Sequence, residues 1–289
     1  MKIRDILKNK KPSVSFEVFP PKKDAAFAPV KAAVARLCKA NPSFMSVTYG
    51  AGGSANMNTL DIASFIKDEC NTTPLAHLTC VMATPDKIKD EAARLTAAGI
   101  ENILALRGDM PSDATIPPPG HFTHAIDLIK MLRELGDFCI GGACYPECHP
   151  ECEHLADDIR HIREKVDAGL DFITTQMFFD NDVYYRYLAK LRDAGITIPV
   201  IPGIMPVTNK KQLPRITKIS EAFLPMRFKA IADRFGDDPD QMLNAGVAYA
   251  TDQIIDLFAN GVNAVHVYTM NQPIVAERIM ANLGSIVAK

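Results

Sequence analysis

The stretch Ala168-Gly169-Leu170-Asp171-Phe172-Ile173-Thr174-Thr175-Gln176 contains one complete junction between a helix and a strand. Its Gly is suited to a left-handed helix cap, and the apolar residue after the Gly leads into the next element. Residues 172–178 form an apolar, strand-like run in which the polar Gln176 falls near the end. A helix, a cap, a strand and a polar residue in this order predict one unit of a parallel α/β fold.

The same unit recurs along the chain. Equivalent caps occur at Ala98-Gly99-Ile100, Ala194-Gly195-Ile196 and Asn260-Gly261-Val262. Apolar runs begin near positions 13, 44, 75, 102, 138, 171, 199 and 263, and segments with helical apolar spacing separate them. About eight such units predict a (β/α)₈ TIM barrel, and a doubly wound open sheet is the alternative architecture.

The one long interval in this series precedes the last run. Helical patterns cover 209–220, 221–235 and 239–258, with a break at Gly236-Asp237-Asp238. We therefore expect extra helices inserted after strand 7, before the barrel helix that belongs to that strand. Because no linker or change in composition divides the chain, residues 1–289 are predicted to form a single domain.

Composition restricts the classes of partner. A net charge of −2 and a pI near 6.4 give no nucleic-acid footprint. No apolar run reaches the roughly 18 residues that a membrane span needs, and the charged N-terminus is not followed by an apolar signal region. Seven scattered cysteines favour a reducing, cytoplasmic setting over a disulfide framework.

Three of these cysteines form a cluster. Cys144, Cys148 and Cys152 are four residues apart, with His149 and His154 among them. Thiolates and imidazoles could bind zinc or an iron–sulfur cluster. The spacing lacks the two-residue gaps typical of such sites, and prolines at 146 and 150 prevent a regular helix. We predict incidental loop cysteines and no metal, with the metal site as the alternative.

Polar residues stand in or just after seven of the eight apolar runs. They are Glu17, Thr48, Tyr49, His77, Arg107, Asp109, Tyr145, Glu147, Gln176 and Asn271. A barrel of parallel strands collects its chemistry at the carboxyl ends of the strands. This pattern predicts an active site at that end.

Eight short motifs in register carry a family resemblance. They are Phe16-Glu17-Val18-Phe19-Pro20-Pro21-Lys22, Ser46-Val47-Thr48-Tyr49-Gly50, Ala76-His77-Leu78-Thr79-Cys80, Leu106-Arg107-Gly108-Asp109, Tyr145-Pro146-Glu147, Lys165-Val166-Asp167-Ala168-Gly169, Gln176-Met177-Phe178-Phe179-Asp180 and Pro202-Gly203-Ile204-Met205-Pro206. Together they resemble the methylenetetrahydrofolate reductase family in its bacterial, single-domain form, from about residue 13 to about 272. The resemblance implies an FAD-bearing barrel that reduces 5,10-methylenetetrahydrofolate to 5-methyltetrahydrofolate.

The resemblance also implies two catalytic carboxylates. Glu17 would be the general acid that opens the methylene bridge, and its apolar neighbours Phe16, Val18 and Phe19 favour a protonated carboxyl. The alternative for Glu17 is a solvated or salt-bridged side chain. Asp109 would lie near the pyrimidine edge of the flavin and the pterin, where its charge tunes the cofactor. Without the resemblance, Arg-Gly-Asp would often be an ordinary surface loop.

The remaining site residues are carried over position by position. The implied FAD contacts are Thr48, His77, Arg107, Gly108, Asp109, His124, Ala125, Tyr145, His149, Asp158 and Lys165. The implied substrate contacts are Glu17, Asp109, Gln176 and Gln212. Asp158 and Lys165 are seven residues apart and so share one helix face, whose alternative interpretation is an exposed charged surface. No Gly-x-Gly-x-x-Gly fingerprint occurs, so the dinucleotide would not bind in the Rossmann manner.

Two departures from the family pattern concern the electron donor and the folate tail. Ile216 stands where an aromatic residue is expected one turn after Gln212, and Gln272 stands where an Arg often follows the Asn. NADH or NADPH is the expected donor. The rival is a flavin and folate subunit supplied by ferredoxin or a partner subunit, and a third possibility is a pterin-dependent methyl-transfer barrel without flavin. We also expect a homo-oligomer.

Overall fold

The computed structural model describes residues 1–289 except 22–26, 50–54, 110–119, 221 and 288–289. Its strands are β1 (Ser13–Val18), β2 (Met45–Val47), β3 (Pro74–Thr79), β4 (Asn102–Leu106), β5 (Cys139–Cys144), β6 (Phe172–Thr175), β7 (Val200–Ile201), β8 (Gly203–Ile204) and β9 (Ala264–Tyr268). Its helices are α1 (Ile3–Ile6), α2 (Phe27–Cys38), α3 (Ala55–Asp68), α4 (Pro85–Ala97), α5 (Ala125–Leu135), α6 (Leu155–Asp167), α7 (Asn181–Asp193), the 3₁₀ turn η2 (Lys210–Gln212), α8 (Leu213–Ser220), α9 (Met226–Phe235), α10 (Pro239–Ala259), α11 (Pro273–Leu283) and the 3₁₀ turn η3 (Gly284–Ile286).

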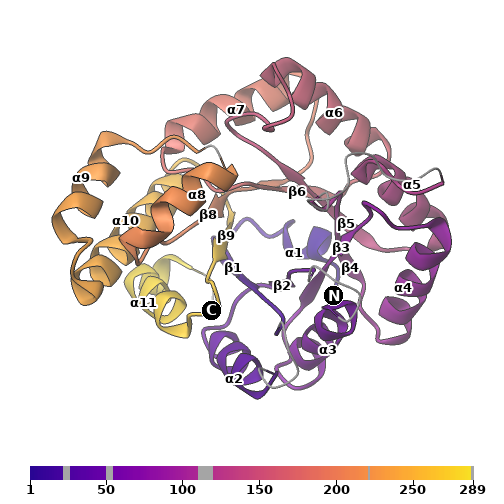
Figure 1. The fold of residues 1–289 in the computed structure, drawn as a ribbon, viewed down its shortest axis with the longest axis horizontal. Helices are drawn as coiled ribbons and strands as arrows, with labels where there is room; N and C mark the ends of the chain where they lie inside the picture. The colour runs from indigo at the N-terminus through magenta and orange to yellow at the C-terminus, as the bar shows by residue number, and fades with distance from the viewer. Residues whose placement is uncertain (22–26, 50–54, 110–119, 221, 288–289) are drawn as a thin grey trace.

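The strands form one parallel sheet in the order β7-β6-β5-β4-β3-β2-β1-β9-β8. Figure 1 shows this sheet as a nearly closed ring with helices around it, which confirms the predicted TIM barrel. The predicted seventh strand is split in two. Pro202 lies between β7, which pairs with β6, and β8, which pairs with β9. Because proline has no N–H to give to a ladder, the split follows from the sequence itself.

The four predicted caps are confirmed. Gly99, Gly169, Gly195 and Gly261 all have positive φ, between 67° and 117°. In each, the apolar residue after the Gly donates its N–H to a carbonyl five residues back, as Ile100 does to Leu95 at 2.9 Å. This is the Schellman arrangement, which satisfies the last helix carbonyls and turns the chain into the next strand.

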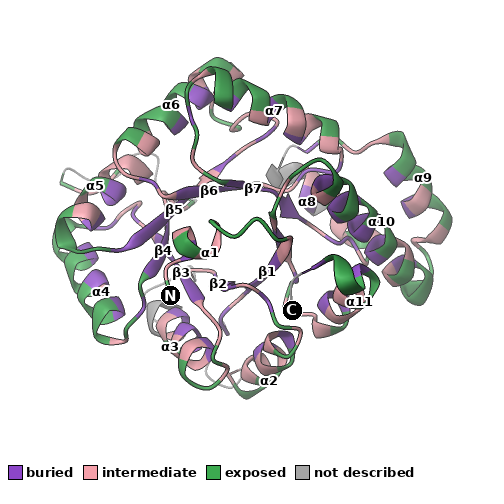
Figure 2. Cartoon of the chain, turned by 180° about the vertical axis from the view of Figure 1, so that it is seen from behind, coloured by how far each residue is buried: buried purple, intermediate pink, exposed green. Residues whose placement is uncertain are grey.

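Inside the barrel, the amino-terminal half is apolar and closed by α1. Ile3 is fully buried against a cluster that includes Leu75, Leu104 and Phe172. The buried amide of Asn102 accepts a hydrogen bond from the Ile3 N–H at 2.8 Å, which ties α1 to β4. In Figures 1 and 2, α1 accordingly lies within the ring of strands. With this half filled, polar chemistry is confined to the other end.

The long interval contains η2, α8 and α9 before the barrel helix α10, as predicted. Here the first two inserted segments end at Ser220 and Phe235, and a separate small core lies beneath them. Its aromatic members are Phe179, Phe228 and Tyr249, and the Tyr249 hydroxyl donates to the Phe179 carbonyl. The inserted helices are therefore fixed to the loop after β6 and to α10.

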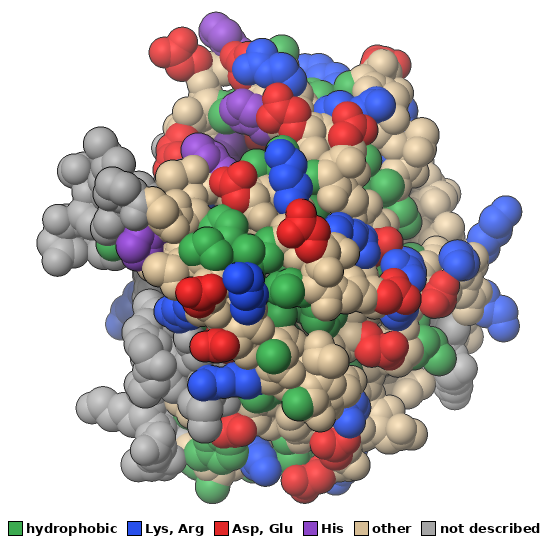
Figure 3. All heavy atoms as spheres, turned by 90° about the vertical axis from the view of Figure 1, so that its right-hand side faces the viewer, with side chains coloured by type: hydrophobic (Ala, Val, Ile, Leu, Met, Phe, Trp, Pro, Cys, Tyr) green, Lys and Arg blue, Asp and Glu red, His purple; other side chains and the backbone are tan. Residues whose placement is uncertain are grey.

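The described residues on one face of the barrel form no large patch of a single charge. In Figure 3, which views the α4 to α6 side of the barrel, Lys and Arg side chains alternate with Asp and Glu. None of the helices that the structure describes is long and apolar enough to cross a membrane.

Candidate active site

The strand register brings polar side chains together at the carboxyl end of the barrel. Glu17 on β1 pairs with Ser46 on β2 and with Tyr268 on β9. Ser15, two residues earlier on the same face of β1, pairs with His266. Alternating residues point to one side of a strand, so β1 directs both Ser15 and Glu17 into the barrel.

Glu17 is the centre of a buried polar cluster. Its side chain is 12% exposed, and Oε2 lies 3.5 Å from Nε2 of His77 and 3.9 Å from Nε2 of His266. The hydroxyl of Ser46 donates to the same oxygen at 3.4 Å. Thus the structure brings together two residues that the resemblance implies, Glu17 and His77, and adds two that it does not.

The surroundings of Glu17 differ from the apolar setting expected from its sequence neighbours. Burial is the strongest influence and raises the pKa of the carboxyl, but the polar contact with His266, the charges of His77 and His266, and the Ser46 hydroxyl together bring the pKa below its ordinary value. The expectation was wrong because Phe16 and Val18 point outward into the core between strands and helices, whereas Glu17 points inward.

His77 is an uncharged partner at neutral pH. Burial lowers the pKa of this imidazole to about 4, against a smaller raising effect of Glu17 and a further lowering effect of His266. Among the described residues, its Nε2 is buried without a hydrogen-bond partner. The lowering effect that a charged His77 has on the Glu17 pKa is therefore absent at pH 7.

The lowered pKa of His77 predicts that the folded protein loses stability in acid. Below pH 6.5 an unfolded chain protonates this imidazole, whereas the folded protein resists protonation until about pH 4. Stability is thus lost as the pH falls, by about 2 kcal/mol between pH 6.5 and 4.5. Urea unfolding across this window should show a shallower pH dependence for His77→Gln than for the unchanged protein. Equal slopes would show that His77 is not buried in its neutral form.

The loop after β9 anchors the end of β1. Asn271, with a φ of 56°, accepts from the Phe19 N–H at 2.8 Å and donates to the Phe19 carbonyl at 2.9 Å. The Thr269 hydroxyl donates to the Glu17 carbonyl at 2.7 Å. These bonds fix the backbone at Glu17 and two residues after it, which gives Asn271 a structural role.

The loop after β4 is tied to the loop after β5 by an ion pair. Arg107 forms a two-pronged contact with Glu151, at 2.5 and 2.6 Å. Gly108 has a φ of 85°, and a Cβ there would lie 2.9 Å from Cβ of Thr79, so the close backbone approach is to β3. Burial is the main cause that raises the pKa of the Tyr145 phenol, and the charge of the exposed Asp109 raises it further.

The loop after β5 and helix α6 form a connected group. Tyr145 and His149 make an edge-to-face contact with centroids 4.6 Å apart. The His149 N–H donates to Asp158 at 3.2 Å, and Nδ1 of His149 accepts from the Glu151 N–H at 3.1 Å. Burial lowers the pKa of His149. Since Nδ1 accepts, a neutral His149 presents a protonated Nε2 as a donor.

Asp158 and Lys165 share a face of α6 that turns inward, so the alternative of an exposed charged surface is wrong. Asp158 is 4% exposed, and Lys165 donates to the Ala143 carbonyl of β5 at 3.1 Å. Burial raises the pKa of Asp158, and the charge of Lys165 opposes that rise. Burial also lowers the pKa of Lys165.

The other implied residues occupy separate places around this end. Thr48 follows β2, and its N–H donates to the Val18 carbonyl at 3.0 Å. His124 is exposed and precedes α5, whose first residue is Ala125. Gln176 follows β6, where its Oε1 accepts from the Met177 N–H at 2.9 Å. Gln212 ends η2.

The structure also describes the two residues that depart from the family pattern, Ile216 and Gln272. Ile216 is 8% exposed and belongs to the small core beneath the inserted helices, so it contributes packing there. Gln272 caps the start of α11 through its backbone.

Glu147 bridges the loop after β5 to the α8–α9 connection by accepting from the Phe223 N–H at 2.8 Å.

The cysteine cluster is divided between two environments. Cys144 is fully buried at the end of β5, where burial raises its pKa to about 12, whereas Cys148 and Cys152 lie in the following loop. No group of three or more His, Cys, Asp or Glu side chains within the described part of the chain could hold a metal ion.

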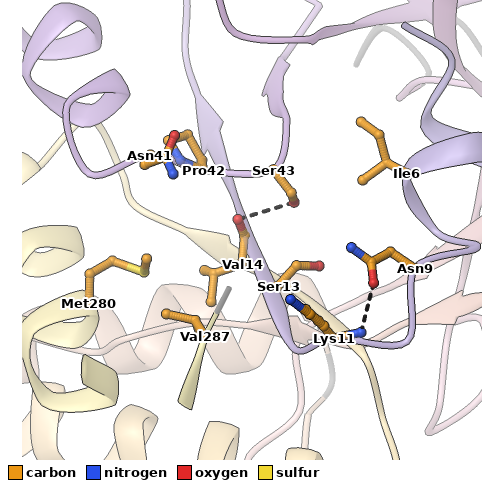
Figure 4. Close-up of a pocket in the computed structure, with 10 residues that line it drawn as sticks. All are labelled: Ile6, Asn9, Lys11, Ser13, Val14, Asn41, Pro42, Ser43, Met280 and Val287. Atoms are coloured by element: carbon orange, nitrogen blue, oxygen red, sulfur yellow. Dashed lines mark hydrogen bonds between the residues drawn. The ribbon is translucent and has the colours of Figure 1, made fainter. Parts of the chain in front are cut away.

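A hollow at the opposite end of the barrel is distinct from this site. Figure 4 shows its lining, in which Ser13 and Val14 begin β1 and Ser43 precedes β2. The amino ends of barrel strands usually serve stability, whereas catalysis occurs at the carboxyl ends. The Glu17 cluster is therefore the stronger candidate for an active site.

Sequence reasoning missed Ser15, Ser46 and His266. All three are buried polar residues in the interior of the barrel. The available signal was alternation: Ser15 and Glu17 occupy the same face of one strand, and His266 is the central residue of an otherwise apolar run, 264–268.

Comparisons with known proteins identify the family to which the chain belongs. A model of the family described as methylenetetrahydrofolate reductase matches residues 2–284. The 5,10-methylenetetrahydrofolate reductase of Escherichia coli K12 is 36% identical over 94% of this chain and 90% of its own. A probable methylenetetrahydrofolate reductase (NADH) of Oryza sativa is 34% identical over 99% of this chain, which spans about half of that relative's length.

Solved structures support the fold. A Clostridium thermocellum protein described as binding two copies of 5-methyl-5,6,7,8-tetrahydrofolic acid aligns over 98% of each chain, with a TM-score of 0.65 and 13% identity. A dihydropteroate synthase of Xanthomonas albilineans aligns over 96% of this chain and 93% of its own, with a TM-score of 0.52 and 17% identity.

Proposed function

Because this chain belongs to the methylenetetrahydrofolate reductase family, we propose that it reduces 5,10-methylenetetrahydrofolate to 5-methyltetrahydrofolate with FAD as its cofactor. The observation that carries the proposal is the Glu17 cluster. A buried carboxyl at the carboxyl end of a barrel, surrounded by two imidazoles and a hydroxyl, is a group able to hold and release a proton.

The residues around this end fit a flavin dinucleotide. Lys165 and the Nε2–H of His149 supply donors for phosphate oxygens, and Arg107, which pairs with Glu151 here, supplies a further positive charge. Nε2 of His77 is a buried atom that lacks a hydrogen-bond partner among the described residues. Thr48, Gly108, Asp109, His124, Ala125, Tyr145 and Asp158 complete the set that would hold the cofactor. When bound and reduced, flavin supplies a hydride.

Glu17 would donate its proton to a nitrogen of the methylene bridge. Protonation allows that C–N bond to open, which leaves an iminium carbon that can accept a hydride. Gln176 and Gln212 each offer a donor and an acceptor that suit the edge of a pterin. Asp109 would contact the same ring. Substrate binding would exclude water from Glu17 and so strengthen burial, the influence that already favours the protonated carboxyl most strongly.

The first test is a visible absorption spectrum of the purified protein, which should show bound flavin. Anaerobic mixing with NADH, NADPH or reduced ferredoxin should then bleach that spectrum with one of the three. Reoxidation by 5,10-methylenetetrahydrofolate, with formation of 5-methyltetrahydrofolate, completes the test. Bleaching by ferredoxin alone would favour the partner-fed alternative. A protein that binds folate but no flavin would overturn the proposal in favour of methyl transfer.

Replacement of Asp109 by Asn should raise the midpoint potential of the bound flavin. A negative charge beside the isoalloxazine disfavours the addition of electrons, by the same like-charge repulsion that shifts a pKa. The variant should still accept electrons from its donor, but its reaction with folate should slow through loss of the pterin contact. A redox titration against a reference dye, combined with stopped-flow half-reactions, measures both effects. An unchanged potential with both half-reactions intact would place Asp109 away from the flavin.

A further inference from the structure

We propose that His266 and Ser46 form a proton relay that reloads Glu17, an inference that rests on the proposed role of Glu17 as general acid. Nε2 of His266 lies 3.0 Å from the Ser46 hydroxyl, and that hydroxyl lies 3.4 Å from Oε2 of Glu17. The direct distance from Nε2 to Oε2 is 3.9 Å, which is too long for a hydrogen bond. The serine oxygen is therefore the connection between the imidazole and the carboxyl.

The other side of the ring fixes its tautomer. Nδ1 of His266 lies 2.7 Å from the Ser15 hydroxyl, which also lies 3.0 Å from the Val265 carbonyl. A carbonyl oxygen can only accept, so the single hydrogen of Ser15 goes to Val265, and Ser15 must accept from Nδ1–H. Nε2 is then the nitrogen that gains and loses a proton, and it is the one that faces Ser46.

Packing holds the ring in this orientation. Phe44 stacks on His266 with centroids 5.6 Å apart and an interplanar angle of 12°, while Tyr268 meets the ring edge-on. His266 is 2% exposed. The titratable groups that face this pair are His77 on β3 and Tyr268 on β9. His77 is uncharged at neutral pH, and burial, with Glu17 as a further cause, raises the pKa of Tyr268 well above its ordinary value.

One proton can reside on Glu17 or on His266, the two ends of the hydrogen-bonded chain through Ser46. With Glu17 ionised, Nε2–H of His266 donates to Ser46, and Ser46 donates to Oε2. When Glu17 has protonated the substrate, the Ser46 proton moves to Oε2 and the Nε2 proton moves to Ser46. This step breaks one O–H and one N–H bond, forms two O–H bonds, and leaves a neutral carboxyl beside a neutral imidazole. Between turnovers a proton from solvent returns to the pair through Glu17, which is 9% exposed against 2% for His266.

The relay makes a specific prediction for pH dependence. Glu17 and His266 share one proton. The pKa at which the pair loses it is never lower than the pKa of Glu17 beside a neutral imidazole, because the second group offers another place for the proton. The rate of the folate half-reaction should therefore fall at high pH with the pKa of the Glu17–His266 pair. This fall is the alkaline limb of the pH profile. In His266→Gln, which keeps hydrogen-bonding capacity but holds no proton, this alkaline limb should move to lower pH.

Single-turnover oxidation of the reduced protein by 5,10-methylenetetrahydrofolate, measured across pH, tests this shift. Ser46→Ala is the second variant and should show the same displacement, because a proton on His266 then has no bridging oxygen to Glu17. Phe44→Leu is the control: it disturbs packing on the ring but leaves the relay, so its limb should stay in place even if the rate falls. Slower reactions with unshifted limbs in both relay variants would reduce His266 to a packing role.

A second readout is independent of activity. In protein labelled with ¹⁵N-histidine, the His266 resonances can be assigned among seven histidines by their loss in His266→Gln. In the neutral ring, Nδ1 should carry the proton and Nε2 should carry none. Protonation at Nε2 alone in the neutral ring would overturn the relay. If the unchanged protein forms no 5-methyltetrahydrofolate, the proposed function fails, whereas intact activity with the wrong tautomer or an unshifted limb refutes only the relay.

Discussion

Replacing Glu17 by Gln should lower the rate of folate reduction by about 10²–10⁴-fold while flavin stays bound and reducible. Glutamine retains the size and hydrogen-bonding capacity of the side chain but cannot donate a carboxyl proton. The C–N bond of the methylene bridge would then have to open without acid assistance. Stopped-flow measurement of the two half-reactions should assign the whole loss to the folate step, with flavin reduction unchanged.

Glu147→Gln is the matched control for this variant. Glu147 is a second partly buried carboxyl at the same end of the barrel, burial also raises its pKa, and it contacts the Phe223 backbone and not the Glu17 cluster. Its replacement should slow folate reduction far less than that of Glu17. Comparable losses in both variants would mean that any buried carboxylate at this end supports the structure, and Glu17 would lose its assigned role.

Local sequence was sufficient to predict the architecture because each unit carries its own signals. The Gly caps at 99, 169, 195 and 261 act within a few residues, and all four adopt the expected conformation. The split of the seventh strand at Pro202 follows equally from one residue. The closure of the barrel by α1 could not be predicted, because it depends on a contact between Ile3 and Asn102, which are 99 residues apart.

The candidate site was only partly predictable for the same reason. Motifs locate residues at strand ends, but the partners of those residues come from other strands. Ser46 and His266 meet near Glu17 although 220 residues separate them in the chain. Likewise, the pairing of Arg107 with Glu151 joins two loops 44 residues apart. Ser46, His77 and His266 make the environment of Glu17 polar, which its flanking residues could not indicate.

Gly246 is the position at which a single methyl group should cost the most stability. It lies on α10, and a Cβ there would overlap the carbonyl oxygen of Val207 and lie 2.8 Å from the carbonyl carbon. The obstacle is backbone, which cannot rotate away as a side chain can. Alanine should favour the helix by about 1 kcal/mol, but overpacking against a rigid neighbour costs about 1–3 kcal/mol and sometimes more. We expect Gly246→Ala to destabilise the protein by about 3 kcal/mol.

Urea unfolding of Gly246→Ala measures this cost, and Ala248→Gly on the exposed side of α10 calibrates the helix contribution at about 1 kcal/mol. The effect should extend to the site, because Val207 lies in the segment that leads from β8 to Gln212 in η2. To admit the methyl group, either α10 must move away from the barrel or this segment must shift. Weaker folate binding by the surviving folded variant would indicate the second. A variant as stable as the parent would contradict the close seating of α10 on Val207, since the gain in helix propensity would then face no opposing contact.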